Sequence, residues 1–185
     1  MSPRTGYGQE VRDISSFVGF IPTITEQIEA FFELAPLSES DVVYDLGSGD
    51  GRLLFSALEK GAGKAVGVEF NPELVRQAAD TARNKGLQDR VTFLEADVMQ
   101  VALSGASVVF CYLSGDAPLA LKPKFESELK PGVRVIMEFF PVPGWKPLKI
   151  IEKERKRFYL YIMPPEITGV EADSDPLLDY LSYPI

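Results

Sequence analysis

Three glycines at alternate positions, Gly47, Gly49 and Gly51, separate an apolar run from a helical pattern. The residues before them, Val42–Leu46, are mostly apolar and β-branched, as in a strand that is covered on both faces. Leucine and alanine then recur at helical spacing, and a second apolar run ends at Glu69. Glycine tolerates the positive φ angles that a tight connection needs. The stretch therefore predicts a strand, a glycine turn, a helix and a second strand.

The same alternation continues along the chain and predicts an α/β fold with a mainly parallel sheet. Further strands are expected at residues 91–94, 107–112, 133–137, 149–152 and 158–163, and further helices at 71–86 and 123–129. The last two strands are too close in sequence for a parallel crossover. One of them is therefore expected to run antiparallel.

The length of 185 residues and a hydrophobic content of 45% suit a single domain. We place this domain at residues 1–164, with residues 1–22 as an N-terminal cap segment and residues 165–185 as an acidic tail. The one cysteine, Cys111, allows no internal disulfide, and no apolar run approaches the ~20 residues of a membrane helix. The first residues lack the apolar core of a signal peptide. These features predict a soluble, cytoplasmic protein.

The net charge of −8 argues against a protein whose main task is binding nucleic acid. The charge is unevenly distributed, because a basic cluster precedes the acidic tail. This cluster consists of Lys146, Lys149, Lys153, Arg155, Lys156 and Arg157. It is either a solvated hairpin or a basic rim that meets an acidic partner surface.

Polar side chains follow the first three predicted strands: Asp45 to Gly51, then Glu69, then Asp97. In open α/β sheets, ligands bind beyond the carboxyl ends of the strands. Glu69 lies about 20 residues beyond the glycine turn, the separation at which an acidic side chain meets ribose hydroxyls. The pattern therefore predicts a site for a nucleotide-like cofactor.

The glycine spacing distinguishes between kinds of cofactor. A dinucleotide site has the pattern G-x-G-x-x-G and presents backbone N–H groups to a pyrophosphate. Here the glycines alternate, Asp45 precedes them and Asp50 lies among them. Acidic groups suit a cationic ligand better than a pyrophosphate. The chain has no G-x-x-x-x-G-K-[ST] phosphate loop, and its lack of histidine argues against a zinc site and excludes a histidine-based triad. We expect no metal.

The segment DLGSGDG at Asp45–Gly51 resembles the acidic-x-Gly-x-Gly-x-Gly motif of the S-adenosylmethionine-dependent methyltransferases, and the resemblance covers about residues 20–164. It implies a Rossmann-like, mostly parallel seven-stranded sheet with helices on both faces and an antiparallel closing strand. It implies S-adenosylmethionine as the cofactor, with the glycine turn holding the methionine part, Glu69 the ribose hydroxyls, and Asp97 near the adenine amino group. The implied cofactor-binding residues are Thr23, Asp45, Leu46, Gly47, Ser48, Gly49, Gly51, Glu69, Phe70, Asn71, Asp97, Val98 and Tyr112.

Three further motifs narrow the resemblance: FIPT at Phe20–Thr23, LKPKFESELKPGVRVI at Leu121–Ile136, and GWKP at Gly144–Pro147. Together they resemble the archaeal broad-specificity protein lysine methyltransferases and the relatives that methylate the mitochondrial ATP synthase c subunit. The resemblance implies methyl transfer to lysine amines of proteins. The residues at 112–116 are not an Asn-Pro-Pro-Tyr motif, which disfavours methylation of adenine N6 or of a glutamine amide.

Methylation of lysine requires a neutral amine held in line with the methyl group, and this positioning supplies most of the acceleration. An apolar aromatic channel close to a cation lowers the pKa of the lysine by disfavouring its charged form. The candidates for this channel are Phe20, Tyr112, Phe139, Phe140 and Trp145. Tyr112 is the strongest of them because it ends the fourth predicted strand. The sequence identifies no general base.

Other functions stay open at this point. The chain could methylate a small molecule or RNA, or bind the cofactor without catalysis as a subunit of an assembly. A nicotinamide dehydrogenase is a more remote alternative. For the preferred function we expect a protein substrate with an accessible lysine, no membrane or nucleic-acid partner, and a monomer or weak homodimer.

Overall fold

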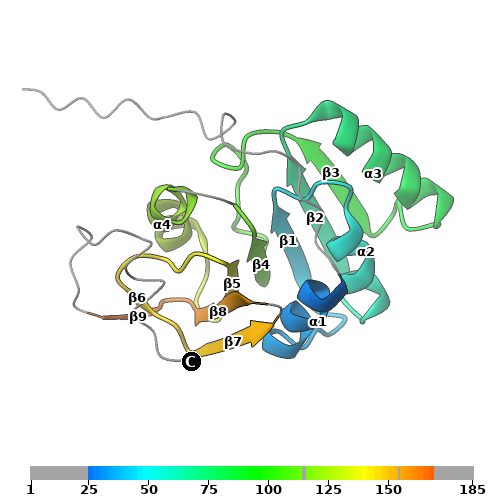
Figure 1. Cartoon of the computed structure of the whole chain (residues 1–185). Helices are drawn as coiled ribbons and strands as arrows, with labels where there is room; N and C mark the ends of the chain where they lie inside the picture. Colours follow the sequence, from blue (N-terminus) through cyan, green and yellow to red (C-terminus); the bar gives the residue numbers. More distant parts are fainter. Residues whose placement is uncertain (1–24, 114–115, 154, 169–185) are drawn as a thin grey trace, which may run out of the picture.

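A seven-stranded sheet forms the centre of the fold (Figure 1). The computed structural model describes residues 25–113, 116–153 and 155–168. The strands of this sheet are β1 (Val42–Leu46), β2 (Lys64–Glu69), β3 (Val91–Glu95), β4 (Val108–Cys111), β5 (Arg134–Glu138), β7 (Lys149–Lys153) and β8 (Lys156–Ile162). Their order across the sheet is β3-β2-β1-β4-β5-β8-β7. The pairings among β1 to β5 are parallel, whereas β8 runs antiparallel to both β5 and β7, which confirms the mostly parallel sheet with an antiparallel closing strand.

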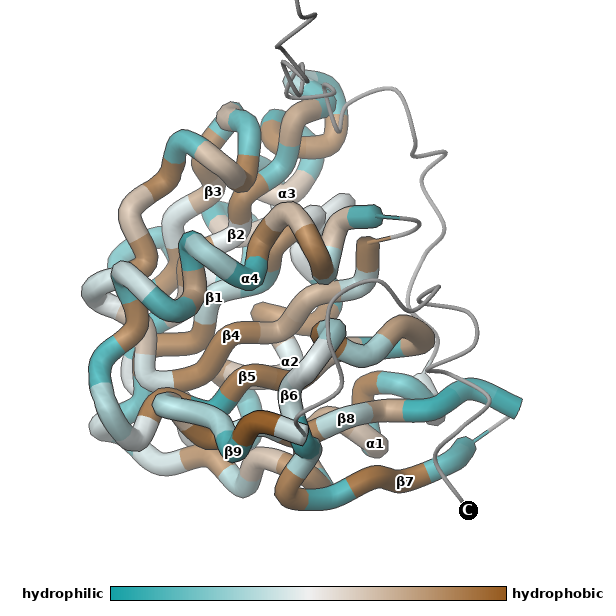
Figure 2. The backbone as a smooth tube through the Cα atoms, turned by 90° about the vertical axis from the view of Figure 1, so that its left-hand side faces the viewer, coloured by the Kyte–Doolittle hydropathy of each residue, from teal (hydrophilic) through white to brown (hydrophobic). Residues whose placement is uncertain are grey.

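Helices cover both faces of the sheet, as predicted (Figure 1). The helices are α1 (Thr25–Leu34), α2 (Arg52–Glu59), α3 (Pro72–Asn84) and α4 (Ala117–Glu128). Side chains alternate along β4: Val108 and Phe110 pack with α1 and α2, whereas Val109 and Cys111 pack with α4. The central strand β4 and the middle of β5 are accordingly hydrophobic (Figure 2). No helix in the described ranges is long and apolar enough to cross a bilayer.

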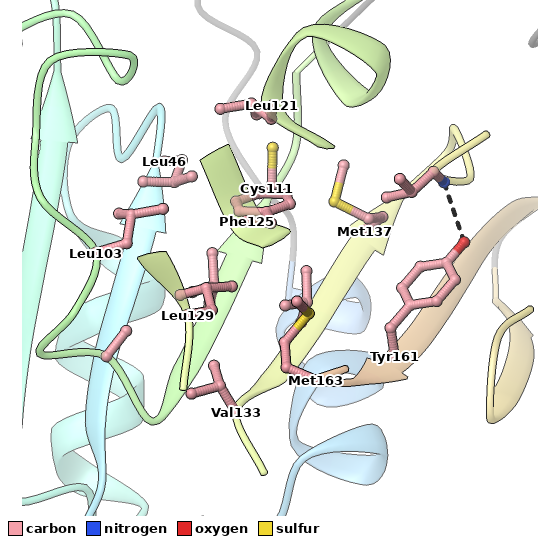
Figure 3. Close-up of a cluster of buried hydrophobic side chains, with 14 of the residues drawn as sticks. Leu46, Leu103, Cys111, Leu121, Phe125, Leu129, Val133, Met137, Tyr161 and Met163 are labelled. Atoms are coloured by element: carbon pink, nitrogen blue, oxygen red, sulfur yellow. Dashed lines mark hydrogen bonds between the residues drawn. The ribbon is translucent and has the colours of Figure 1, made fainter. Parts of the chain in front are cut away.

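The core beneath α4 contains aromatic residues from the end of the domain (Figure 3). The Tyr161 hydroxyl accepts a hydrogen bond from the Val142 N–H at 3.1 Å. Trp145 is fully buried, and its ring centroid lies 5.4 Å from that of Tyr161. The Trp145 indole N–H donates to Glu126 Oε1 at 3.1 Å. Trp145 is therefore a core residue, and its assignment to the substrate channel was wrong.

Helix α4 begins six residues earlier than the sequence predicts, at Ala117 instead of residue 123. Proline at position 123 suggested a first helical turn, because proline is favoured there. In the structure Pro123 lies inside the helix. Proline has no backbone N–H, so the helical hydrogen bond from residue 123 to the carbonyl of Leu119 is missing. Both residues are exposed to solvent, so water can bond to that carbonyl. This exposure explains why the helix tolerates an internal proline.

A second, two-stranded sheet pairs β6 (Trp145–Lys146) antiparallel with β9 (Glu166–Ile167). The sequence does not predict it, because two-residue strands have no readable periodicity. This pairing brings residues 166–167, which were expected to belong to the acidic tail, against the folded domain. The cap segment 1–22 and tail residues 169–185 lie outside the described residues.

The basic cluster of the closing strands is largely neutralised within the protein. Lys149 and Lys153 both face Glu33 of α1, with N···O distances of 3.7 and 3.1 Å. The other ion pairs are Lys146–Glu166, Arg157–Glu152 and Lys156–Glu138. The exposed pairs among these contribute little stability, whereas Glu138 of the last pair is buried. They do, however, reduce the positive field that an acidic partner would require.

Candidate functional site

The turn between β1 and α2 needs its glycines. Gly47, Gly49 and Gly51 have φ angles of 88°, 54° and 79°, in the region that favours glycine. The N–H groups at positions 47 and 48 both donate to the Val68 carbonyl, at 2.8 and 3.0 Å. A Cβ atom on Gly51 would lie 2.5 Å from Cζ of Phe93. The turn is thus fixed against β2 at the carboxyl edge of the sheet, where Gly47 is exposed.

Glu69, at the end of β2, is held against this turn by hydrogen bonds. Its Oε2 accepts a hydrogen bond from the Gly49 N–H at 2.9 Å, and its Oε1 accepts one from the Asn71 N–H at 2.9 Å. Asn71 in turn caps α3 by accepting from the Glu73 N–H at 2.9 Å. Each carboxylate oxygen has lone-pair capacity for a further donor. Glu69 is therefore an oriented acceptor for a pair of hydroxyl groups.

Asp45 lies at the end of β1 with only 5% of its surface exposed. Its pKa is raised to about 8. Burial is the main cause, and the negative charges of Glu69, Glu138 and Asp50 add to it. A positively charged ligand at this edge would favour the ionised carboxylate. The site therefore fits a cofactor that carries cationic groups, and it does not fit a pyrophosphate.

Some of the other residues predicted to bind the cofactor lie at the edge of the sheet, and others lie in the core. Phe70 is 61% exposed directly after Glu69. Asp97 follows β3 and its Oδ1 accepts from the Met99 N–H at 2.8 Å. Val98 is buried beside it, and the Leu46 side chain is fully buried, which leaves only its backbone for a ligand. Thr23 lies outside the described residues.

The Ser48 side chain points toward the sheet. A Cβ atom on Gly67 of β2 would lie 2.6 Å from Ser48 Oγ, so the hydroxyl lies directly over this glycine. The hydroxyl is buried and has no hydrogen-bond partner in the part of the chain that the structure describes. Any contact of Ser48 with a ligand is therefore expected from its backbone.

Ser48→Ala should leave cofactor affinity unchanged and keep or raise the melting temperature, because it removes a buried hydroxyl without a partner. Calorimetry and thermal unfolding measure the two effects. Ser38→Ala is a matched control, since the Ser38 hydroxyl donates to Asp41 at 3.0 Å and its loss should cost about 1 kcal/mol. A drop in affinity of more than about threefold for Ser48→Ala would show that the hydroxyl does contact the ligand.

A second polar cluster lies at the ends of β4 and β5. Glu138 is fully buried, and its Oε1 accepts from Gln27 Nε2 at 2.6 Å and from Lys156 Nζ at 3.1 Å. Lys156 Nζ also lies 4.9 Å from the ring centroid of the half-buried Tyr112. Burial raises the pKa of Glu138, although Lys156 and Gln27 oppose this effect.

Sequence reasoning identified Tyr112 but missed Glu138, Gln27 and Lys156. The available signal was a carboxylate directly after the apolar run Val-Ile-Met, since β5 reads Arg-Val-Ile-Met-Glu. Its buried partner Gln27 is 111 residues away in sequence, so periodicity gives no sign of the contact.

Phe139 begins a sharp turn after β5. Its φ angle is 71°, which is unusual for a residue with a side chain and indicates local strain. Its N–H donates to the Arg157 carbonyl at 2.8 Å, and its half-buried ring lies 5.0 Å from that of Phe140 in an edge-on arrangement. Both aromatic residues thus lie close to the Glu138 cluster. Phe20, the remaining channel candidate, lies outside the described residues.

The described residues contain no group of three or more histidine, cysteine, aspartate or glutamate side chains that could hold a metal ion. Cys111 is buried, and this burial raises the pKa of its thiol. The thiol is therefore protonated, in an apolar setting, and does not act as a nucleophile.

Known proteins similar to this chain share its fold and much of its sequence. The model of the ANTKMT methyltransferase domain matches residues 45–149. A protein-lysine N-methyltransferase of Saccharolobus islandicus (strain REY15A) is 37% identical over 151 residues, which is 79% of this chain and 94% of the relative. A human lysine N-methyltransferase, named for the c subunit of ATP synthase, is 37% identical over 128 residues, but this match spans only 54% of that protein.

One solved structure covers nearly the same part of the chain. It is described as an RNA methyltransferase from Salinibacter ruber in complex with S-adenosyl-L-homocysteine. It superimposes with a TM-score of 0.76 at 34% sequence identity, and the match covers 81% of this chain and 98% of the other.

Proposed function

The chain belongs to the ANTKMT methyltransferase domain family, and we propose that this S-adenosylmethionine-dependent methyltransferase transfers methyl groups to lysine side-chain amines of proteins. The observation that carries the proposal is the 37% identity to a protein-lysine N-methyltransferase over 94% of that relative. The carboxylates of Asp45 and Glu69 at the carboxyl edge of the sheet support it, because they suit a cationic cofactor that carries a ribose.

The geometry of the site supports the following cofactor-binding roles as part of the proposal. Glu69 would hold the ribose hydroxyls, since two N–H groups already orient its carboxylate. Asp45 and the backbone of the glycine turn would hold the methionine end, where the ammonium group complements the buried carboxylate. Phe70 and Asp97 would meet the adenine. When bound, S-adenosylmethionine supplies a methyl group on a positively charged sulfur, which needs no further activation by the protein.

The acceptor amine would approach past Tyr112 and Phe139, at the ends of β4 and β5, with Phe20 as a further candidate. The positive charge on the cofactor sulfur would disfavour the charged form of lysine and so lower its pKa. In this arrangement the protein contributes chiefly by holding a neutral amine in line with the methyl group.

RNA is the second candidate acceptor, because the similar Salinibacter ruber structure is described as an RNA methyltransferase. The net charge of −8 and the internal pairing of Lys146, Lys149, Lys153, Lys156 and Arg157 with acids favour a protein acceptor instead. A small-molecule acceptor, or cofactor binding without catalysis, are further outcomes that the same experiment separates.

The test is to incubate the purified protein with methyl-tritiated S-adenosylmethionine and a native cell extract, and then to separate protein, RNA and small molecules. We expect label in the protein fraction, and background label when Asp45→Ala replaces the wild type. Label confined to RNA or to a metabolite would refute the lysine proposal. Cofactor binding without transfer to any fraction would make the chain a non-catalytic subunit.

We propose in addition that the protein works in the cytoplasm as a monomer or weak homodimer. The single cysteine, buried and in the thiol form, is consistent with a reducing compartment. We also propose one domain over residues 1–164, with the segment 1–22 acting as a cap over the site. Sedimentation of the purified chain tests the oligomeric state.

A further inference from the structure

We propose that Glu138 and the Tyr112 ring form the binding site for the ammonium group of the acceptor lysine, and that Lys156 occupies this site until an acceptor replaces it. The inference rests on the proposed function, because it assumes a lysine acceptor. Glu138 and Tyr112 would bind the acceptor, and Lys156 would compete with the acceptor for them.

Glu138 is the first element of this site. Its carboxylate is fully buried at the end of β5. Gln27 and Lys156 both donate to Oε1, whereas Oε2 is buried without a hydrogen-bond partner in the described part of the chain. Leaving a buried charged oxygen unpaired is costly, so such atoms in native structures call for an explanation. An additional N–H donor from a bound ammonium group would satisfy Oε2.

Lys156 shows which chemistry the site accepts. Its ammonium nitrogen lies 3.1 Å from Glu138 Oε1 and 4.9 Å from the centroid of the Tyr112 ring. A carboxylate together with an aromatic face is a favourable setting for an alkylammonium ion. The side chain of an acceptor lysine carries the same group on the same four-carbon chain. Lys156 thus behaves as an internal copy of the ligand.

The site also lies next to the expected cofactor position. Phe110 of β4 pairs in register with Ile136 of β5 and with Asp45 of β1. Tyr112 and Glu138 are each two residues further along, so both project beyond the carboxyl edge on the same face as Asp45. The negative charge of Glu138 is accordingly one of the causes that raise the pKa of Asp45.

The Glu138 carboxylate can also take the proton that the acceptor must lose. The N–H bond of the ammonium group breaks, and the proton forms an O–H bond at Oε2. The electron pair left on nitrogen then forms the bond to the methyl group, while the sulfur–methyl bond breaks with its electron pair remaining on sulfur. Burial raises the pKa of Glu138, in the direction that suits a base working near neutral pH.

Lys156 is placed to exchange with an acceptor. It is the first residue of β8, directly after the connection from β7, and its side chain is 23% exposed. A lysine at this position can swing its ammonium group into water without disturbing the strand. An acceptor must therefore compete with the Lys156 side chain. The apparent affinity of the acceptor is its intrinsic affinity multiplied by the fraction of time that the site is open.

A direct test uses n-butylammonium, which carries the ligand group alone, in an NMR titration of the full chain. Lys156→Gln should strengthen binding about tenfold, as expected if the site is open about a tenth of the time in the wild type. Lys153→Gln is the matched control: it removes a lysine from the same hairpin that pairs with Glu33 on the surface, and it should change nothing. Equal affinity in wild type and Lys156→Gln would overturn the proposal.

Glu138→Gln should weaken n-butylammonium binding about tenfold or more, because a neutral amide replaces a charge-assisted acceptor. Glu152→Gln, on the edge strand β7, is its control because Glu152 pairs with Arg157 on the surface. Should Glu138→Gln fail to fold, Tyr112→Leu provides the second variant, with a loss of about fivefold from the removed aromatic face. Unchanged binding in the folded variants would contradict the assignment.

Methylation of a lysine-containing acceptor adds a catalytic readout. Lys156→Gln should lower KM with kcat unchanged, whereas Glu138→Gln should lower kcat and remove the acidic limb of the pH profile. If no lysine acceptor exists, n-butylammonium binding still decides whether this cluster is an alkylammonium site. Failure of the proposed function is therefore distinguishable from failure of this inference.

Discussion

Replacing Glu69 with alanine should weaken S-adenosylmethionine binding about a hundredfold or more. The carboxylate would accept two ribose hydroxyls, and each charge-assisted hydrogen bond is worth about 1.5–3 kcal/mol. The variant also deprives the N–H groups of Gly49 and Asn71 of their acceptor, which loosens the glycine turn. A total loss of about 3 kcal/mol corresponds to roughly a hundredfold in Kd. Isothermal titration calorimetry measures it directly.

The matched control is Glu95→Ala. Glu95 pairs in register with Glu69 on the adjacent strand β3, but it is exposed. The two variants thus remove the same charge from neighbouring strands, and Glu95→Ala should bind the cofactor as the wild type does. If Glu69→Ala retained affinity within about threefold of the control, Glu69 would not be the ribose ligand.

The second large effect is a steep pH dependence of cofactor affinity that originates in Asp45. Its pKa is raised to about 8, first by burial and then by the neighbouring carboxylates. Below that pH the free protein holds a proton on Asp45, which must leave before the carboxylate can pair with a cationic group. Affinity should therefore rise about tenfold between pH 6 and pH 7, and more slowly as the pH approaches 8.

Asp45→Asn separates this effect from other titrating groups. Between pH 6 and pH 7 its affinity should be flat, and no higher than that of the wild type at pH 6, since its side chain cannot ionise. A tenfold rise that persists in Asp45→Asn would assign the pH dependence to another group.

The stability of the free protein should fall as the pH rises, whereas its cofactor affinity rises. Because the pKa of Asp45 is higher in the folded than in the unfolded chain, its contribution to stability is fully present below about pH 4 and is lost as the pH rises through about 8. Bound cofactor should therefore raise the melting temperature more at pH 8 than at pH 6. Differential scanning fluorimetry with and without S-adenosylmethionine measures both trends.

Much of the fold could be predicted because its signals are local. The unit from Val42 to Glu69 has an apolar strand, a turn that only glycine tolerates, and a helix of regular period. Asn71 and the proline after it mark the start of α3 by capping, which needs no tertiary information. The start of α4 was wrong because a proline can be a first-turn residue or an exposed interior one, and burial decides between them.

The candidate site divides in the same way. Asp45, the glycines and Glu69 lie within one contiguous stretch, so their spacing alone indicated a cofactor site. Glu138 receives Gln27 from α1 and Lys156 from β8, and only the sheet order brings these elements together. Trp145 was misassigned because no periodicity in the sequence indicates the pairing of β6 with β9, and in the structure Trp145 is fully buried in the core.

The most direct measurement of the central claim is the chemical identity of the methylated group. Protein labelled in a cell extract with methyl-tritiated S-adenosylmethionine is hydrolysed to amino acids, and the radioactive product is identified by chromatography and mass spectrometry. We predict that the labelled amino acid is lysine methylated on its ε-nitrogen, and that the label is absent when Asp45→Ala is used. Label recovered in another amino acid, or in nucleosides while the protein hydrolysate stays at background, would contradict the assignment of this chain as a protein-lysine methyltransferase.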